Sequence, residues 1–198
     1  MIVLAVDATG DGLTAALDVG GRVLRASRTG RTPHDEALLP AVEGLLRRAR
    51  LSWKDLDAVA AAAGPGRFTG IRVGLAFAAA AGFRLGVPAL ALSRLEARAE
   101  GAPGDVLAAL PGWKGEVYHQ RFRRTRRGPV PDGAAAWAPA DEWPRVRAEA
   151  EARGLAVAFS DVGAAELASV ARRRLAARDL PPFEPFYLKP AGYEKNRR

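Results

Sequence analysis

A glycine-rich run in the first half of the chain constrains its fold more than any other feature. The run is G-P-G-R-F-T-G-I-R-V-G at residues 64–74, and it lies between an apolar segment of strand type and an apolar segment of helix type. Gly64 and Gly66 allow a positive φ or a close backbone approach, and Thr69 is a suitable N-cap. The run therefore predicts a strand, a tight turn and a helix whose positive end faces that turn.

The spacing of apolar residues predicts the same succession of elements in both halves of the chain. Pro40 is tolerated only in a first turn, so the first helix is expected to start near Leu39 or to kink there. The succession predicts an α/β protein with a duplicated ribonuclease-H-like (actin-like, ASKHA) fold and two subdomains, residues 1–100 and 101–198. Strands are predicted at residues 2–6, 13–18, 22–27, 57–63, 105–110, 115–124, 134–138 and 155–159, helices at 35–49, 69–85, 142–153 and 164–178, and an extended segment at 181–189.

The glycine run and the first predicted hairpin each have two interpretations. Backbone N–H groups at a helix N-terminus favour a bound phosphate or carboxylate, whereas a tight turn without a ligand uses the same residues. Actin-like nucleotide-binding proteins carry an Asp in the first hairpin turn to hold a metal, but Asp7 and Thr9 could equally form a local Asx turn. The candidate ligand-binding residues are Asp7, Thr9, Gly64, Gly66, Thr69 and Gly70.

The chain is basic, with a formal net charge of +8 over 198 residues. A basic surface attracts the phosphates of nucleic acids, whereas an arginine-rich composition of the source organism would raise arginine everywhere. Two further basic clusters lie at residues 172–174 and 195–198. The candidate RNA-contact residues are Arg121, Arg123, Arg124, Arg126 and Arg127.

Residue types exclude several classes of site. The chain has no cysteine, and His34 and His119 do not form a metal-ligand pattern or a Ser-His-Asp arrangement, so no metal site is expected. No run reaches the roughly 18 apolar residues of a membrane span. We therefore expect a cytoplasmic protein without membrane contact.

The predicted helix at 69–85 has no polar face. A helix that is apolar all round must be covered all round, either by a second chain or by the two halves of this one. Its small residues would allow close helix approach. The candidate interface residues are Leu38, Leu39, Val42 and Leu46 on the first helix and Arg72, Leu75, Ala76, Ala79 and Phe83 on the second.

Several motifs along the chain resemble those of the TsaB (YeaZ) family, the partner subunit in bacterial tRNA threonylcarbamoyladenosine synthesis. They are the glycine run, I-V-L-A-V-D-A-T-G-D-G-L-T-A-A-L at 2–17, H-D-E-A-L-L-P at 34–40, G-V-P-A-L-A-L-S-R-L-E-A at 86–97, G-E-V-Y at 115–118 and P-F-Y-L-K at 185–189. Arg67 departs from the family's Ser, Pro111 replaces the usual Asp, and the chain is shorter than typical members of the family. The catalytic paralogue TsaD carries metal-binding histidines where this chain has L-S-R-L-E-A, so the resemblance implies a paralogue without that metal site.

The resemblance implies a non-catalytic subunit that binds TsaD. The complex would transfer a threonylcarbamoyl group to N6 of adenosine 37 in tRNAs reading ANN codons, with TsaE as a further partner and tRNA bound through the complex. No cofactor is expected on this chain alone, with ATP or ADP at the complex interface, and the isolated chain could form a homodimer. Two alternatives are an independent actin-fold ATPase, kinase or peptidase, and a stand-alone RNA-binding module.

Overall fold

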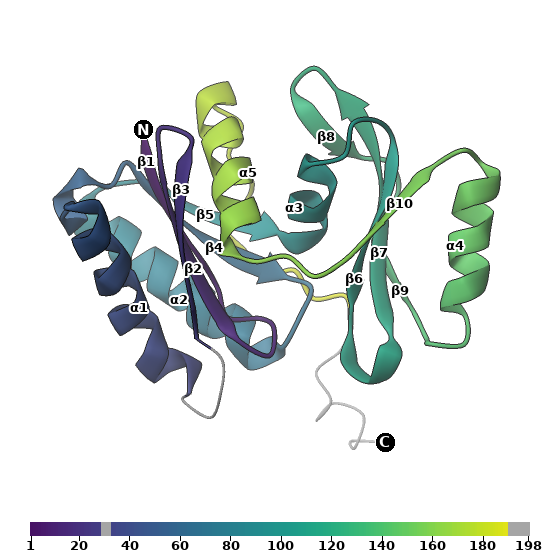
Figure 1. The fold of residues 1–198 in the computed structure, drawn as a ribbon, viewed down its shortest axis with the longest axis horizontal. Helices are drawn as coiled ribbons and strands as arrows, with labels where there is room; N and C mark the ends of the chain where they lie inside the picture. The colour runs from purple at the N-terminus through teal and green to yellow at the C-terminus, as the bar shows by residue number, and fades with distance from the viewer. Residues whose placement is uncertain (29–32, 190–198) are drawn as a thin grey trace.

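The computed structural model describes residues 1–28 and 33–189 and contains two β-sheets with helices against them (Figure 1). The first sheet has the strand order β3-β2-β1-β4-β5. Strands β1, β2 and β3 are antiparallel neighbours, whereas β4 and β5 run parallel to β1. Their bounds are β1 Ile2–Asp7, β2 Leu13–Val19, β3 Arg22–Arg28, β4 Ala58–Gly64 and β5 Ala89–Ser93.

Both faces of the first sheet are covered by helices. Strand β1 alternates between them: Leu4 and Val6 pack in one core with α1 and α2, and Val3 and Ala5 pack in the other core with α5. Helix α1 spans His34–Ala49, α2 spans Phe68–Leu85 and α5 spans Ala164–Ala177. By length and composition, α2 alone among the described helices could cross a membrane, which is weak evidence because a core helix meets the same criterion.

The second sheet has the strand order β10-β6-β7-β8, with β9 also pairing with β7. The strands β8-β7-β6-β10 have the same relative directions as β3-β2-β1-β4 in the first sheet. In both sets, three antiparallel neighbours are followed by one parallel strand, since β6, β7 and β8 are antiparallel and β10 is parallel to β6. The strands are β6 Val106–Pro111, β7 Val117–Thr125, β8 Gly128–Pro131, β9 Ala136–Ala138 and β10 Ala156–Phe159; the helices α3 Arg94–Glu100 and α4 Trp143–Ala152 lie on opposite faces (Figure 1). Short 3₁₀ helices lie at Trp53–Asp55 (η1) and Trp113–Gly115 (η2).

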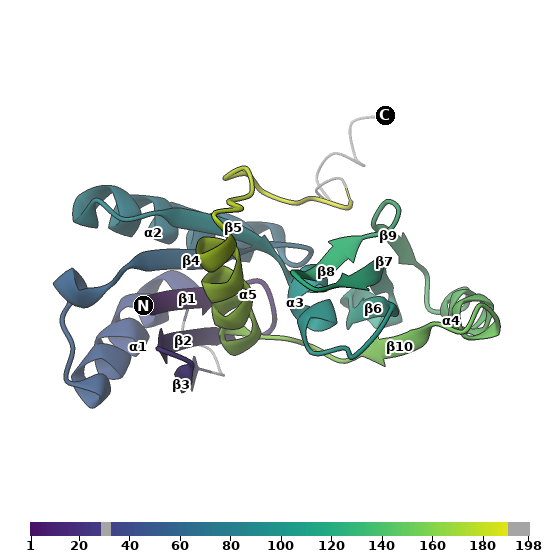
Figure 2. The same ribbon diagram turned by 90° about the horizontal axis from the view of Figure 1, so that it is seen from above.

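The predicted division at residue 100 separates the two sheets but not the helices. Helix α3 precedes residue 100 yet packs on β6 of the second sheet, and α5 comes from the second half yet packs on β1 and β2. The segment after α5 then crosses both halves (Figure 2): the Phe186 N–H donates to the Ala63 carbonyl at 2.7 Å, and Lys189 Nζ contacts both Glu116 carboxylate oxygens at 2.6 Å. The two halves are therefore joined by this segment and by two helices, α3 and α5, each of which packs on the sheet of the other half.

The structure corrects some predicted elements. Helix α1 begins at His34 and holds Pro40 inside, so the expected start near Leu39 is wrong. Helix α2 begins at Phe68 with Arg67 as N-cap and no side-chain cap bond, so the predicted capping by Thr69 is also wrong. The sequence predictions omitted β5, α3 and β8.

Candidate functional site

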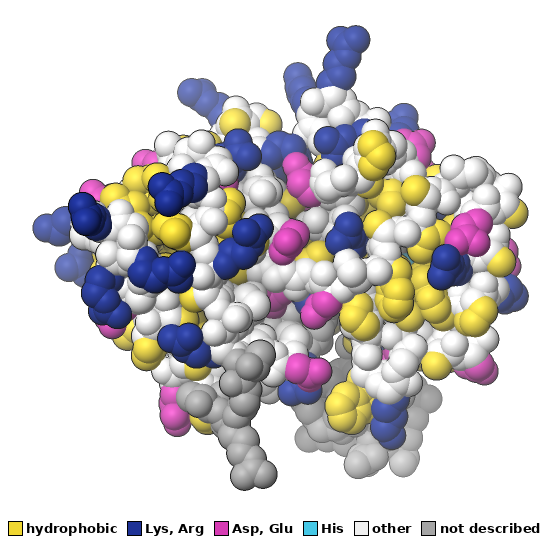
Figure 3. Space-filling view, viewed as in Figure 1, with side chains coloured by type: hydrophobic (Ala, Val, Ile, Leu, Met, Phe, Trp, Pro, Cys, Tyr) yellow, Lys and Arg dark blue, Asp and Glu magenta, His cyan; other side chains and the backbone are white. Residues whose placement is uncertain are grey.

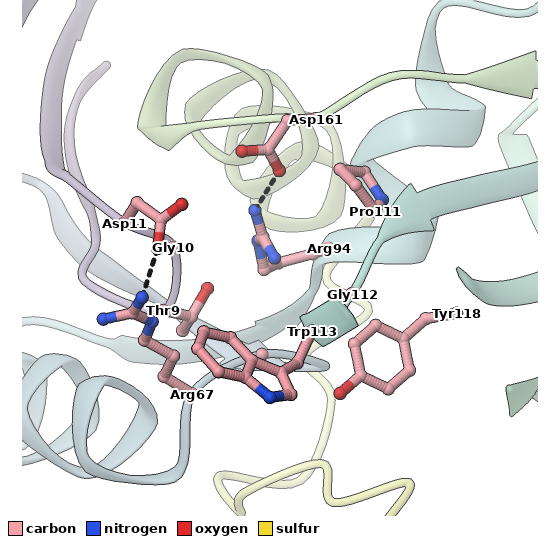
Figure 4. Close-up of a pocket in the computed structure, with 11 residues that line it drawn as sticks. Thr9, Gly10, Asp11, Arg67, Arg94, Pro111, Gly112, Trp113, Tyr118 and Asp161 are labelled. Atoms are coloured by element: carbon pink, nitrogen blue, oxygen red, sulfur yellow. Dashed lines mark hydrogen bonds and ion pairs between the residues drawn. The ribbon is translucent and has the colours of Figure 1, made fainter. Parts of the chain in front are cut away.

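A pocket of about 310 Å³ lies between the two halves, where the connection after β1 meets the end of β6 (Figure 4). Crevices beyond the carboxyl ends of strands are common ligand sites in α/β proteins. The pocket is lined by Thr9, Gly10, Asp11, Gly66, Arg67, Arg94, Pro111, Gly112, Trp113, Tyr118 and Asp161. Of the six predicted ligand-binding residues, only Thr9 and Gly66 line it.

The centre of this site is Arg94, which begins α3 and is 3% exposed. Its Nε donates to Asp7 Oδ2 at 2.9 Å, and its Nη1 donates to the Pro65 carbonyl at 3.0 Å. Its Nη2 donates to the Asp161 carboxylate and to the Val162 carbonyl. One guanidinium thus ties the end of β1, the glycine run and the connection from β10 to α5.

Asp7 accepts hydrogen bonds on both of its carboxylate oxygens in this arrangement. Its Oδ1 accepts from the Thr9 N–H at 2.8 Å and from Thr9 Oγ1 at 2.6 Å, while Arg94 takes Oδ2. This is the local Asx-type turn of the alternative interpretation, with a buried cation added. Both carboxylate oxygens are engaged by groups of the same chain, and the role of Asp7 in binding a ligand stays a prediction.

Both cations of the site are paired with carboxylates of the same chain. Arg94 pairs with Asp7 and Asp161, and Arg67 pairs with Asp11 (Figure 4). Two guanidinium groups therefore face three carboxylates. Because the cations are already paired, the pocket is a poor site for the phosphate or carboxylate that the glycine run had predicted.

The glycines of the run act mainly in close packing. A Cβ on Gly64, whose φ is +118°, would lie 2.5 Å from the Phe186 carbonyl oxygen, and one on Gly70 would lie 1.9 Å from the Ala8 carbonyl oxygen. A Cβ on Gly66 would lie 2.6 Å from Thr9 Cβ. Atoms of this chain occupy the space that a side chain at Gly64 or Gly70 would need, and neither glycine lines the pocket. Thr69 is exposed and lies outside the pocket.

Two aromatic side chains, Trp113 and Tyr118, also line the pocket (Figure 4). Trp113 of η2 is 67% exposed, and Tyr118 of β7 is partly buried. Burial raises the pKa of the Tyr118 phenol, and the nearby Glu116 carboxylate raises it further. Tyr118 therefore keeps its proton at neutral pH and is a hydrogen-bond donor.

The two histidines lie apart from this pocket. His34 Nδ1 is 2.9 Å from the Ala8 carbonyl oxygen at the start of α1. His119 lies on β7 with its ring near Trp143 of α4, and burial lowers its pKa. Within residues 1–28 and 33–189, no group of three or more His, Cys, Asp or Glu side chains could hold a metal ion.

The predicted interface residues divide between core and surface. Leu38, Val42 and Leu46 of α1 and Leu75 of α2 are buried in the core shared with the first sheet. Their assignment to a partner contact is therefore wrong. Leu39 is 48% exposed and Phe83 is 92% exposed. Arg72, Ala76, Ala79 and Ala80 are also exposed.

These exposed residues of α2 form one helix face, since positions 72, 76, 79, 80 and 83 recur at three- and four-residue spacing. At its N-terminal end this face meets the C-terminal segment, where Tyr187 stacks on Phe68 and accepts from Arg72 Nε at 3.3 Å. We call the surface of Arg72, Ala76, Ala79, Ala80 and Phe83 the α2 face. It carries a large exposed aromatic among small side chains, as interaction surfaces do.

The predicted arginine cluster is also divided. Arg121 lines a separate small pocket beside α4, and Arg123 has the same strand parity. Arg124, Arg126 and Arg127 lie instead beside α5, where Arg172 pairs with Asp18, and Arg173 and Arg174 pair with Glu96. The cluster at 195–198 lies outside the described residues.

Sequence reasoning missed most of the pocket, including Asp11, Trp113, Tyr118, Asp161 and above all Arg94. A signal for Arg94 was present but was not used, since L-S-R-L-E-A has an arginine where the family segment Ser-Ser-Leu-Glu-Ala has its second serine. Asp161 carried no comparable signal, because it is 67 residues from Arg94 in the chain.

Comparisons with known proteins agree with this fold. The model of the TsaD family, described as tRNA N6-adenosine threonylcarbamoyltransferase, matches residues 28–136, more than half of the chain. The chain is 32% identical over 133 residues to the tRNA threonylcarbamoyladenosine biosynthesis protein TsaB of Escherichia coli, which covers 65% of this chain and 58% of that protein. It is 35% identical over 196 residues to an uncharacterised protein of Mycobacterium leprae, which covers 96% of this chain and 49% of that protein.

The structure of YeaZ from Pseudomonas aeruginosa has a TM-score of 0.74 and 26% identity, and the match covers 94% of this chain and 99% of that one. The match spans about half to two thirds of the length of the curated mycobacterial relatives. Because the family model covers more than half of the chain, and TsaB and YeaZ are its relatives in sequence and in fold, the chain belongs to the TsaB (YeaZ) family.

Proposed function

We propose that this protein is a non-catalytic subunit that acts in tRNA threonylcarbamoyladenosine synthesis by binding a TsaD-type transferase. The complex transfers a threonylcarbamoyl group to N6 of adenosine 37 in tRNAs reading ANN codons, in the cytoplasm. The observation that carries the non-catalytic role is the buried Arg94, which pairs with Asp7 in the cleft. The family membership supports the pathway.

The cleft supports a structural role in three ways. Its two cations are paired with carboxylates of the same chain, the Asp7 oxygens are engaged, and Gly64 and Gly70 pack against backbone. A kinase or ATPase needs cations and N–H groups that remain available to phosphates. Nucleotide is therefore assigned to the interface with the partner rather than to this chain alone.

The same geometry disfavours an independent peptidase. His34 faces the Ala8 carbonyl, and His119 lies between β7 and α4 beside Trp143. A nucleophile needs a general base within hydrogen-bond reach, and neither histidine lines the cleft. If the partner subunit carries out the chemistry, this chain can belong to the family without a general base of its own.

The α2 face is the proposed contact surface for the transferase, and the exposed Leu39 of α1 is a further candidate contact. Phe83 would insert as the aromatic anchor, and Ala76, Ala79 and Ala80 would allow a partner helix to approach closely. The same face could pair two copies of this chain when the transferase is absent. We propose TsaE as a further partner of the complex between this chain and the transferase.

The α2 face is tested by the substitution Ala79→Arg. Ala79 is exposed, so the variant is expected to fold with an unfolding free energy within about 0.5 kcal/mol of the parent. A guanidinium at a close helix crossing combines steric overlap with an unpaired charge, and binding to the transferase should weaken roughly a hundredfold. Calorimetric titration of purified TsaD measures this change.

The matched control is Ala148→Arg on the exposed side of α4. It adds the same charge to a helix far from α2 and should leave the affinity unchanged. Unchanged affinity in the Ala79→Arg variant would show that α2 is not the interface.

A reconstituted assay tests the pathway itself. Adding this chain to TsaD and the other pathway proteins should raise tRNA modification well above background, and the chain alone should have neither transferase nor peptidase activity. Equal modification with and without the chain would reject the subunit role in favour of an independent enzyme or RNA-binding module.

A further inference from the structure

A second groove between the two halves has a volume of about 750 Å³ and lies beside the C-terminal end of α5. Arg124, Arg126 and Arg127 come from β7 and its turn to β8, and Arg172 and Arg173 come from α5. The remaining lining residues are Met1, Gly20, Gly128, Ala176 and Ala177. We call this surface the arginine groove. Figure 3 shows Lys and Arg side chains projecting along the upper edge of the molecule, where α5 and the β7–β8 turn lie.

The five arginines of the groove differ in charge balance. Arg172 pairs with the buried Asp18 at 3.0 Å, and Arg173 pairs with Glu96 and Glu100. Arg124 donates to the Glu100 backbone carbonyl, which leaves its charge unneutralised. Within the described residues, no carboxylate forms an ion pair with Arg124, Arg126 or Arg127. The groove is therefore positive mainly at the β7–β8 turn.

That turn is held in place by the protein itself. Thr125 Oγ1 donates to the Gly128 carbonyl at 2.8 Å and accepts from the Arg127 N–H at 3.1 Å. Arg173 Nη1 donates to the Arg127 carbonyl at 3.1 Å, which ties the turn to α5. A preorganised backbone lowers the ordering cost of binding for the arginines that it presents.

The lining residues favour a particular occupant. They include no carboxylate and no aromatic side chain, so the groove suits a run of negative charges better than stacked bases. A protein partner would need large apolar anchors at the centre of its contact, and Met1 is the only large apolar residue among those that line the groove. The volume and the spread of charge exceed what one phosphate needs.

We propose that the arginine groove binds the ribose–phosphate backbone of tRNA, with Arg124, Arg126 and Arg127 as the principal phosphate contacts. The inference rests on the proposed function, since tRNA is the substrate of that complex. The contact is electrostatic and independent of base sequence, because the groove presents cations without base-reading geometry. It places substrate RNA across both halves, on a surface distinct from the α2 face.

The test is the double substitution Arg126→Gln and Arg127→Gln. Fluorescence anisotropy of a labelled tRNA transcript is measured with the purified chain across a series of NaCl concentrations. Loss of two phosphate contacts should weaken binding on the order of tenfold at low salt and lower the slope of log K against log salt by about 2. The control, Arg145→Gln with Arg147→Gln on α4, makes the same change in net charge far from the groove, at arginines that pair with Glu149 and Glu151, and should change both quantities much less.

Three results would overturn the proposal that the arginine groove binds tRNA. They are a parent chain without measurable tRNA affinity, a groove variant that binds as the parent does, and a control variant that loses as much as the groove variant.

Binding of TsaD by the groove variant separates this inference from the proposed function. Retained TsaD binding with reduced tRNA affinity and reduced modification supports the groove. Normal modification by that variant overturns the groove alone, whereas modification that is independent of the chain overturns the proposed function.

Discussion

The cleft at Arg94 and the arginine groove are both rich in arginine and both lie between the two halves, yet they differ in what surrounds the guanidinium groups. Arg94 is 3% exposed and contacts two carboxylates and two backbone carbonyls. Arg126 and Arg127 are exposed at a turn, and the described residues place no carboxylate in an ion pair with them. Arginine in the first region joins parts of the fold, and arginine in the second is available to an external anion.

A single short helix contributes to both regions. Helix α3 carries Arg94 toward the cleft and Glu96 toward α5, where Glu96 accepts from Arg173 and Arg174. The 5% exposed Glu96 neutralises part of the positive charge beneath the groove. The number of arginines in a region therefore says little about its role unless the carboxylates that the fold brings to it are known.

The sharpest way to break this comparison is Arg94→Met, which keeps an unbranched apolar stem and removes the guanidinium group with its charge. Asp7 would be left buried without its cation, and breaking a buried pair from one side costs about 3–5 kcal/mol. Denaturant unfolding should show this loss. A companion variant, Arg94→Met with Asp7→Asn, removes both charges and should recover part of it. A loss below about 1 kcal/mol in the single variant would mean that Arg94 does not join the fold as described.

A smaller effect is expected from Glu96→Gln at the back of the groove. The amide keeps the shape but loses the charge that holds Arg173 and Arg174, whose contacts with Glu96 lie at 2.5 and 2.9 Å. Both arginines are partly exposed, so water screens them, and we expect a loss of about 2–3 kcal/mol by thermal or denaturant unfolding. The same variant should bind tRNA more tightly, because Arg173 and Arg174 each lose one of their two carboxylate partners. Unchanged tRNA affinity would separate Glu96 from the groove.

Much of the fold could be predicted because its first half has strong local signals. Strands β1 to β4 and helix α2 lie within a residue or two of their predicted bounds, since alternation and the glycine run determine them locally. Strand β5 and helix α3 were missed because the stretch 86–97 was interpreted only as a family motif, and no strand or helix was assigned to it. Ser93 and Glu96 form the start of a capping box there, and the Glu96 N–H does approach Ser93 Oγ at 3.4 Å. That signal could have divided the stretch.

The site was less predictable, for a physical reason. Periodicity shows which residues are apolar but not which face meets a partner, so Leu38 and Leu75 were assigned to an interface although they pack in the core. The pairing of charges depends on residues far apart in the chain, such as Arg173 and Glu96, which are 77 positions apart. The sequence alone therefore predicted arginine clusters without showing which of them are neutralised.

The smallest expected effect is on the stability of the Arg126→Gln, Arg127→Gln variant, and its sign sharpens the comparison. These arginines are exposed and lie beside Arg172 and Arg173, so the parent groove holds like charges close together. Such repulsion destabilises a compact state at low ionic strength and is screened by salt. The free energy of unfolding of the variant should lie within about 0.5 kcal/mol of that of the parent. It should be slightly higher than the parent's at low salt and equal to it at high salt. Thermal unfolding at two salt concentrations measures this difference. A variant clearly less stable than the parent at low salt would show that Arg126 and Arg127 join the fold as Arg94 does, and that the two regions do not differ in kind.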